Sequence, residues 1–147
     1  MSQDLLPPAA IEFAVAAPDW RTAVRAAGDA LVAGGITTDD YTDAMISAIE
    51  ELGPYIVIAP GFALAHARPS EAVKRTGLSW ITLAEPVEFG SPTNDPVDLV
   101  VGLAALDKNE HLQVMAKLAG VLANPDTLAK LRASTDREEV RAALLGE

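Results

Sequence analysis

The sequence has no cysteine, few basic residues and no long hydrophobic run. The absence of cysteine excludes disulfides, iron–sulfur clusters, thiolate zinc sites and cysteine nucleophiles. Lys and Arg number 11 against 21 Asp and Glu, a net charge of −10, which argues against nucleic acid as a partner because phosphate backbones repel such a surface. The longest apolar stretches, such as residues 97–106 with Asp98 inside, fall well short of the ~20 residues that span a bilayer.

The first eight residues, MSQDLLPP, contain neither a basic leader nor an adjoining apolar core. A secretory signal needs both features, so we expect none, and we expect a cytoplasmic protein.

A chain of 147 residues with 50% hydrophobic and 22% charged residues can bury a sizeable core. At this length folding removes roughly 70% of the extended surface from water. We therefore predict one domain over residues 1–147 and exclude disorder as its main description.

The hydrophobic pattern changes repeatedly between the strand period and the helix period. Proline, glycine and capping residues mark where the elements end, with Asp19, Thr38 or Asp39, Asn124 and the pair Thr135 and Glu138 as expected helix caps. The pattern predicts strands over 11–17, 56–59, 62–69, 78–83 and 98–105, and helices over 20–33, 39–52, 109–122, 125–133 and 136–145. This order predicts an α/β fold with three layers, a mixed central sheet with helices on both faces. The loop 85–96, rich in Pro, Gly and Asn, is a candidate rim of a binding site, with Phe89 tucked in or in a short edge strand.

His66 follows an apolar strand, and Arg68 and Pro69 follow it directly. Open α/β sheets usually hold their ligands at strand ends, and an imidazole with a guanidinium two residues later suits an anion such as phosphate. The alternative is that His66 is a polar edge residue and Arg68 a surface charge.

His111 lies in the first turn of the helix predicted to run to Leu122. A helix N-terminus has unpaired N–H groups and a positive dipole end, which attract anions and disfavour protonation of a nearby imidazole. The alternative is a solvated first-turn residue. The two histidines point to an anion site only as a pair.

Other catalytic signatures are absent from the sequence: no Walker loop, dinucleotide-binding glycine motif, nucleophile elbow or HExxH motif occurs. Two histidines fall short of the three or four protein ligands that zinc normally takes, so the residues give a metal site little support.

Several segments, in order and spacing, resemble one known family, the mannitol/fructose class of enzyme IIA (EIIA, type 2) of the bacterial phosphoenolpyruvate-dependent sugar phosphotransferase system (PTS). The similar segments are Gly61–Pro69, Thr76–Ser79, Pro86–Gly90, Asn94–Val100 and His111–Gln113. Within the family, Glu51–Gly61 and the pair Arg68 and Pro69 look most like the ascorbate-type branch.

The resemblance implies a phosphohistidine relay without metal or cofactor. His66 would accept the phosphoryl group from the phosphocarrier protein HPr, His111 would help to hold it, and Arg68 would give electrostatic support. The group would then pass to a cysteine of enzyme IIB, which serves the membrane component IIC. Ala65 stands where members commonly have proline, and Glu50 and Glu51 replace the Arg–Glu pair of mannitol-type members.

Three alternatives stay open at this point. One is a nitrogen-type regulatory relative that binds a regulator instead of feeding a transporter, and another is an α/β domain that merely keeps the motif. A homodimer through the helices also stays open, but no exposed apolar stripe stands out clearly enough to predict one.

Overall fold

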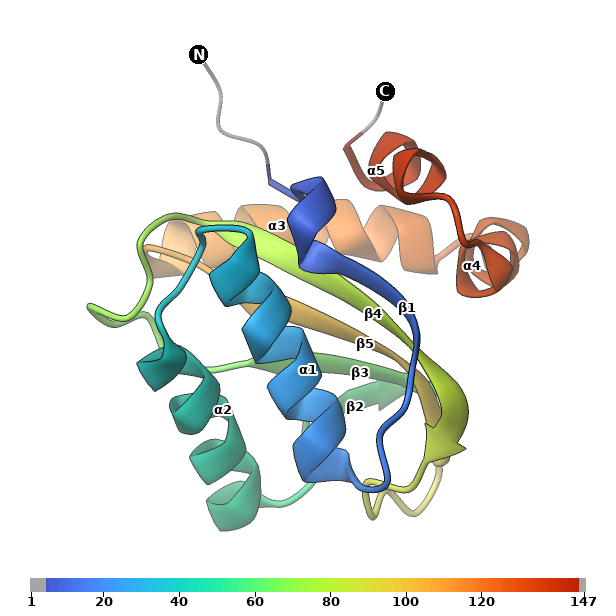
Figure 1. Cartoon of the computed structure of the whole chain (residues 1–147), viewed down its shortest axis with the longest axis horizontal. Coiled ribbons are helices and arrows are strands. Elements are labelled where there is room, and N and C mark those ends of the chain that lie inside the picture. Colours follow the sequence, from blue (N-terminus) through green and yellow to red (C-terminus); the bar gives the residue numbers. More distant parts are fainter. Residues whose placement is uncertain (1–4, 146–147) are drawn as a thin grey trace.

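Five strands form one mixed sheet in the order β1–β4–β5–β3–β2 in the computed structural model, which describes residues 5–145 (Figure 1). The pairs β1–β4 and β3–β5 are parallel, and β2–β3 and β4–β5 are antiparallel. Residues 1–4 and 146–147 lie outside the described residues. They are part of the predicted domain, and residues 1–4 also belong to the segment in which we expect no secretory signal. The strands are β1 (Ile11–Val15), β2 (Val57–Ala59), β3 (Phe62–His66), β4 (Gly77–Val87) and β5 (Val97–Ala104).

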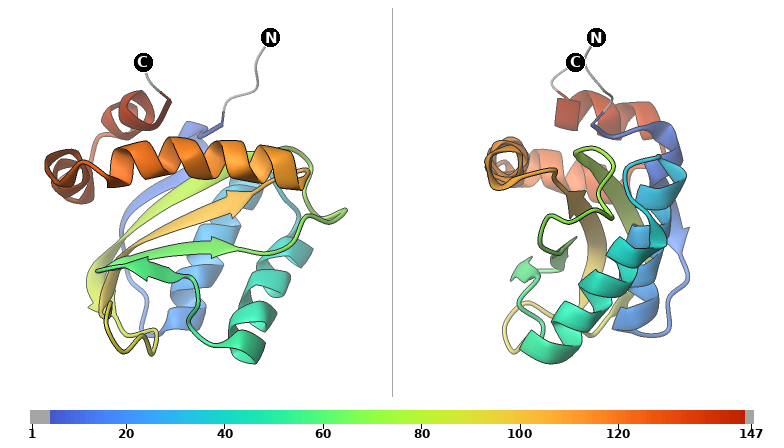
Figure 2. Two further views of the ribbon diagram at one scale, coloured as in Figure 1. Left: turned by 180° about the vertical axis from the view of Figure 1, so that it is seen from behind. Right: turned by 90° about the vertical axis from the view of Figure 1, so that its left-hand side faces the viewer.

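Helices cover both faces of this sheet, so the predicted three-layer α/β fold is confirmed (Figure 2). On one face lie α1 (Trp20–Ala33) and α2 (Asp39–Leu52); on the other lie α3 (Lys108–Leu122), α4 (Pro125–Ala133) and α5 (Arg137–Leu145). A 3-10 turn, η1 (Pro8–Ala10), precedes β1. No helix within residues 5–145 is both long and apolar enough to cross a membrane.

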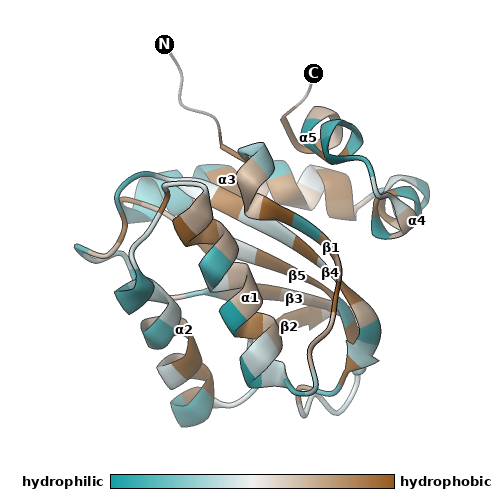
Figure 3. Cartoon of the chain, viewed as in Figure 1, coloured by the Kyte–Doolittle hydropathy of each residue, from teal (hydrophilic) through white to brown (hydrophobic). Residues whose placement is uncertain are grey.

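The core is two clusters of buried side chains, one on each face of the sheet. Neighbours in a strand point to opposite faces, so Ala65 and Val100 belong to the cluster under α1 and α2, whereas Leu64 and Val101 belong to the cluster under α3. The central strands are therefore apolar along most of their length (Figure 3). Around α1 and α2, by contrast, hydrophilic residues alternate with hydrophobic ones.

Most element ends lie within a few residues of their predicted positions. The largest difference is at β4, whose predicted end is residue 83 but which runs on to Val87, into the predicted loop 85–96. Two smaller differences have visible causes. β1 ends at Val15, because Ala14 has a φ of 52° and donates its N–H to Thr82 Oγ1 at 3.0 Å, forming a bulge. The start of α5 is capped by Asp136, whose Oδ1 accepts the Glu138 N–H at 3.0 Å, so the predicted Thr135 cap is wrong by one residue.

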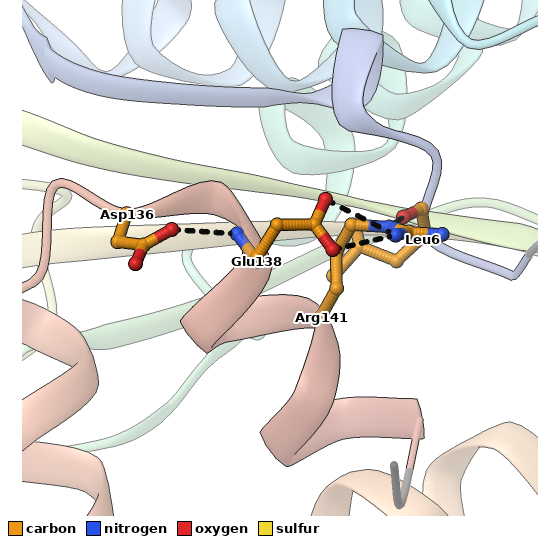
Figure 4. A network of polar contacts seen from close by, with 4 residues as sticks. All are labelled: Leu6, Asp136, Glu138 and Arg141. Atoms are coloured by element: carbon orange, nitrogen blue, oxygen red, sulfur yellow. Dashed lines mark hydrogen bonds and ion pairs between the residues drawn. The ribbon is translucent and has the colours of Figure 1, made fainter.

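Two arginines of α5 attach the C-terminal helix to the N-terminal segment. Arg141 Nε donates to Leu6 O at 2.9 Å and pairs with Glu138 at 3.2 Å (Figure 4). One turn earlier, Arg137 Nε donates to Ile11 O at 3.1 Å. These contacts hold η1 and β1 against the end of the chain.

The loop between β4 and β5 is ordered by one carboxylate. Asp95 Oδ2 accepts the backbone N–H groups of Phe89, Gly90 and Ser91 at 3.0, 2.7 and 3.1 Å. Phe89 is buried and lies outside any strand. This loop precedes β5, whereas His66 pairs with Leu103 at the far end of β5. The prediction of a binding rim here is therefore wrong for a site at His66.

Candidate active site

The chain brings His66 and His111 together at one end of the sheet. His66 is the last residue of β3, which runs parallel to β5. The end of β5 leads directly into α3, which carries His111 in its first turn. The two ring centroids are 5.7 Å apart, with the ring planes inclined at 54°. Parallel pairing of β3 and β5 thus places both imidazoles at the same strand ends.

One ring nitrogen of His66 is engaged by the backbone. Nδ1 lies 2.8 Å from the carbonyl oxygen of Leu64. Since a carbonyl only accepts, Nδ1 carries the proton, and the neutral ring therefore has its lone pair on Nε2. The side chain is partly exposed. His66 thus presents a nucleophilic nitrogen that a partner molecule can approach.

Tyr55 touches His66 and was missed by the sequence reasoning. Its ring meets the imidazole edge-on, with centroids 5.5 Å apart at 83°, and its hydroxyl donates to His66 O at 3.3 Å. Burial raises the pKa of Tyr55, although the residue is 39% exposed. A signal existed, because the predicted strand–turn–strand around residues 60–61 places residue 55 beside the end of β3.

Tyr41 also reaches this strand end, through its hydroxyl. The oxygen accepts the Ala67 N–H at 3.0 Å and lies 2.7 Å from Leu103 O and 3.1 Å from Ala67 O. Burial raises the pKa of Tyr41 to about 12, so the phenol remains protonated at neutral pH. Tyr41 lies on the buried face of α2, and helical spacing carries no signal for these polar contacts.

Side-chain hydrogen bonds fix the first turn of α3, which carries His111. Asp107 caps the helix by accepting the Glu110 N–H at 2.8 Å. Thr76, just before β4, donates its hydroxyl to Glu110 Oε1 at 2.7 Å and accepts the Leu106 N–H at 3.1 Å. The helix N-terminus is therefore held against the sheet next to His66.

His111 is disposed to be neutral. Burial lowers the pKa of the His111 imidazole below its ordinary value of 6.5, and the charge of His66 lowers it further. A neutral ring can donate one hydrogen bond to an anion at the helix N-terminus, where the positive dipole end and free N–H groups add to the attraction.

We expect His111 to titrate below pH 6.5 and the His66→Gln variant to shift the pKa of His111 back towards its ordinary value. Between pH 6.5 and the lowered pKa, His111 binds a proton in the unfolded chain but not in the folded chain. The free energy of unfolding therefore decreases as the pH falls through this range. An NMR titration of the two histidines measures this directly. A His111 midpoint at or above 6.5 would contradict the prediction.

Arg68 lies in the loop that leaves β3, with its side chain exposed. Its guanidinium forms no ion pair or hydrogen bond with any residue between 5 and 145 and shows no contact with either imidazole. No carboxylate of the described residues therefore holds Arg68 in place. The side chain is free to turn towards a bound anion.

The described part of the chain brings no three His, Asp or Glu side chains together in a way that could hold a metal ion. The two imidazoles instead share their surroundings with exposed apolar side chains. Leu106 precedes Asp107, the cap of α3, and is 48% exposed, and Leu112 follows His111 and is 58% exposed. With Tyr55 they give the site an apolar border, a composition that suits contact with another protein.

Known proteins are similar to this chain in both sequence and fold. Residues 4–146 match the sequence model of the family "Phosphoenolpyruvate-dependent sugar phosphotransferase system, EIIA 2". The ascorbate-specific PTS system EIIA component of Escherichia coli K12 is 39% identical over 131 residues, which cover 88% of this chain and 85% of that protein.

Two solved structures add to this similarity. The complex of E. coli mannitol enzyme IIA with phosphorylated enzyme IIB superimposes with a TM-score of 0.83 at 30% identity, covering 97% of this chain and 100% of the matched chain. The nitrogen regulatory protein IIA-Ntr of Neisseria meningitidis superimposes with a TM-score of 0.76 at 27% identity, covering 95% of this chain and 96% of that one.

Proposed function

Because the chain belongs to the EIIA 2 family of the phosphoenolpyruvate-dependent sugar phosphotransferase system, we propose that it is the phosphocarrier of an ascorbate-type system, with His66 as its phosphoryl acceptor. A phosphotransferase component of this kind works as one step of a relay. We propose that residues 1–147 form one EIIA domain that acts in the cytoplasm. The observation that carries the proposal is the His66 imidazole, protonated on Nδ1 and paired with His111 at a helix N-terminus.

The chemistry follows from the free Nε2 of His66. Its lone pair attacks the phosphorus of the phosphohistidine on HPr; a new P–N bond forms as the bond to the donor imidazole breaks. The proton on Nδ1 stays in place, held by Leu64 O at 2.8 Å. In the second step a cysteine thiolate of enzyme IIB attacks the same phosphorus, and His66 leaves as the neutral ring. Such labile bonds need positioning and charge neutralisation more than activation.

Three groups would support the phosphoryl group on His66. The His111 ring, 5.7 Å away between centroids, is close enough to donate a hydrogen bond to a phosphoryl oxygen. The free N–H groups of the first turn of α3 attract the same negative charge. Arg68, which is exposed and has no ion-pair partner among residues 5–145, can turn in to neutralise it. No metal or cofactor takes part in this scheme.

HPr and enzyme IIB would dock in turn on the apolar border formed by Tyr55, Leu106 and Leu112. Weak and rapidly exchanging contacts suit a relay, because the carrier must leave each partner. The similarity to mannitol enzyme IIA in its complex with phosphorylated IIB supports IIB as the acceptor. The membrane component IIC would be served only indirectly, through IIB.

The similarity to ascorbate-specific EIIA favours ascorbate or a related sugar acid as the transported compound. A second candidate function is phosphorylation-dependent regulation, favoured by the similarity to nitrogen regulatory IIA-Ntr. In that role the same His66 would be phosphorylated, but the phosphoryl group would not pass to a transporter.

A reconstituted relay tests the proposal. Labelled phosphoenolpyruvate, enzyme I and HPr are expected to give an acid-labile label in this protein, and NMR should place the phosphoryl group on Nε2 of His66. When an ascorbate-type IIB is added, the label should pass from this protein to IIB. A label that forms but does not pass to any IIB would favour the regulatory role. No label with a cognate HPr would refute both.

A further inference from the structure

The chain has only two tyrosines, and both hydroxyls contact the same peptide group, the one that joins His66 to Ala67. Tyr55 approaches from the segment before β2 and donates to its carbonyl oxygen, His66 O, at 3.3 Å. Tyr41 approaches from α2 and accepts its N–H, Ala67 N, at 3.0 Å. A peptide group is planar and rigid, so bonds to its two ends fix the orientation of the whole plane.

Tyr41 contacts the chain directly after the last residue pair of the ladder between β3 and β5. The parallel ladder between β3 and β5 runs from the pair Phe62–Leu99 to the pair His66–Leu103 and ends there. Ala67 has no partner strand, but the Tyr41 hydroxyl lies between Ala67 N and Leu103 O, at 3.0 and 2.7 Å. It therefore continues the ladder by one step.

Tyr41 itself is well fixed. Its ring is 1% exposed and belongs to the cluster under α1 and α2, with Met45 and Ile49 from the same helix. Its proton has two carbonyl acceptors within reach, Leu103 O and Ala67 O. The hydroxyl is therefore satisfied both as donor and as acceptor, which favours a single geometry.

We propose that Tyr41, assisted by Tyr55, is a positioning residue for phosphoryl transfer: the two hydroxyls hold the His66–Ala67 peptide plane and thereby aim Nε2 of His66. The aim depends on this plane because the His66 side chain branches from the residue whose carbonyl forms it, and because Nδ1 must stay 2.8 Å from Leu64 O to keep the proton off Nε2. A displacement of about 1 Å in a reacting group can slow a reaction a hundredfold.

The inference rests on the proposed phosphoryl transfer to His66, and Tyr41→Phe tests it, since only the hydroxyl is removed. In single-turnover transfer from phosphorylated HPr, we expect the maximal rate to fall about tenfold with the half-saturating HPr concentration little changed. Tyr55→Phe should have a smaller effect, because its longer bond lies at a partly exposed site that water can fill.

Ser79→Ala is the matched control. The Ser79 hydroxyl is also buried and also bridges two backbone groups, accepting from Gly102 N at 3.2 Å and donating to Ala27 O at 2.8 Å. It lies in β4, which β5 separates from β3. We expect Ser79→Ala to shift the urea midpoint about as much as Tyr41→Phe while leaving the transfer rate at the wild-type level.

A second measurement needs no phosphorylation. Nitrogen-15 NMR of unphosphorylated protein should show His66 protonated on Nδ1 in wild type and a mixture of tautomers in Tyr41→Phe. The positioning role would be overturned if Tyr41→Phe kept the wild-type transfer rate and the wild-type tautomer of His66. It would also be overturned if Ser79→Ala lost as much of the transfer rate as Tyr41→Phe. A wild-type protein that takes no label would instead refute the proposed function, while the tautomer result would still report on the geometry.

Discussion

His66→Gln is expected to abolish labelling by phosphoenolpyruvate, enzyme I and HPr entirely. The amide side chain has no lone pair on nitrogen that can form a stable bond to phosphorus, so the acceptor is lost outright. The fold should survive, because His66 lies partly exposed at the end of β3 and adds no buried charge. Acid-labile label measured on gels, beside the circular dichroism spectrum of the same preparation, gives the result.

His111→Gln is the matched comparison, because it removes the other histidine of the pair. Its label should still reach the wild-type level, but more slowly, by up to about a hundredfold, the order of magnitude that loss of one donor to a charged oxygen costs. Stoichiometric label in folded His66→Gln would mean that another residue accepts the phosphoryl group. Equal loss in both variants would mean that the two histidines act as one unit.

Gly102→Ala is expected to destabilise the fold strongly, although it adds only one methyl group. A Cβ on Gly102, in the middle of β5, would overlap the Ser79 hydroxyl and approach Leu31 Cδ1 to 3.2 Å. Overpacking of a core costs about 1–3 kcal/mol, and loss of the buried Ser79 hydrogen bonds adds a similar amount. Against a total stability of about 5–15 kcal/mol, we expect the melting temperature to fall by about 10 °C or more.

Urea unfolding followed by the fluorescence of buried Trp80 measures this change. In the double variant with Ser79→Ala, the overlap with the hydroxyl disappears, so the two costs should not add. Gly120→Ala is the control: this helical glycine has nothing within 4 Å of an added Cβ, and the change should stabilise α3 by about 0.5–1 kcal/mol. Additive costs at Gly102 and Ser79 would contradict the proposed overlap.

Local signals in the sequence predicted the layers of the fold and the two imidazoles, because periodicity and capping depend on neighbouring residues. Asp19 and Asn124 cap their helices as predicted, through bonds to residues two or three positions ahead. The bulge at Ala14 was not predictable, since it depends on Thr82, 68 positions away. The same holds for the Tyr41 hydroxyl, whose partners lie 26 and 62 positions away.

Strand direction explains the largest error at the site. The composition of residues 85–96 is that of a binding loop, but composition does not say at which end of a sheet a loop lies. The antiparallel pairing of β4 with β5 and the parallel pairing of β3 with β5 place that loop at the end away from His66. β5 is mostly apolar and pairs parallel with β3 but antiparallel with β4, so its residues do not reveal the direction of its neighbours. Only the complete topology separates the two ends.

The attachment of α5 to the N-terminal segment sets an order for folding during synthesis. Arg137 and Arg141 bind Ile11 O and Leu6 O across 126 and 135 positions of sequence, so these bonds cannot form until α5 has left the ribosome. The centre of the sheet, β3 with β4 and β5, needs only residues 62–104, and the histidine pair only residues up to 111. The phosphoryl site can therefore assemble before the edge strand β1 is secured, which makes the closure by α5 the late, non-local step.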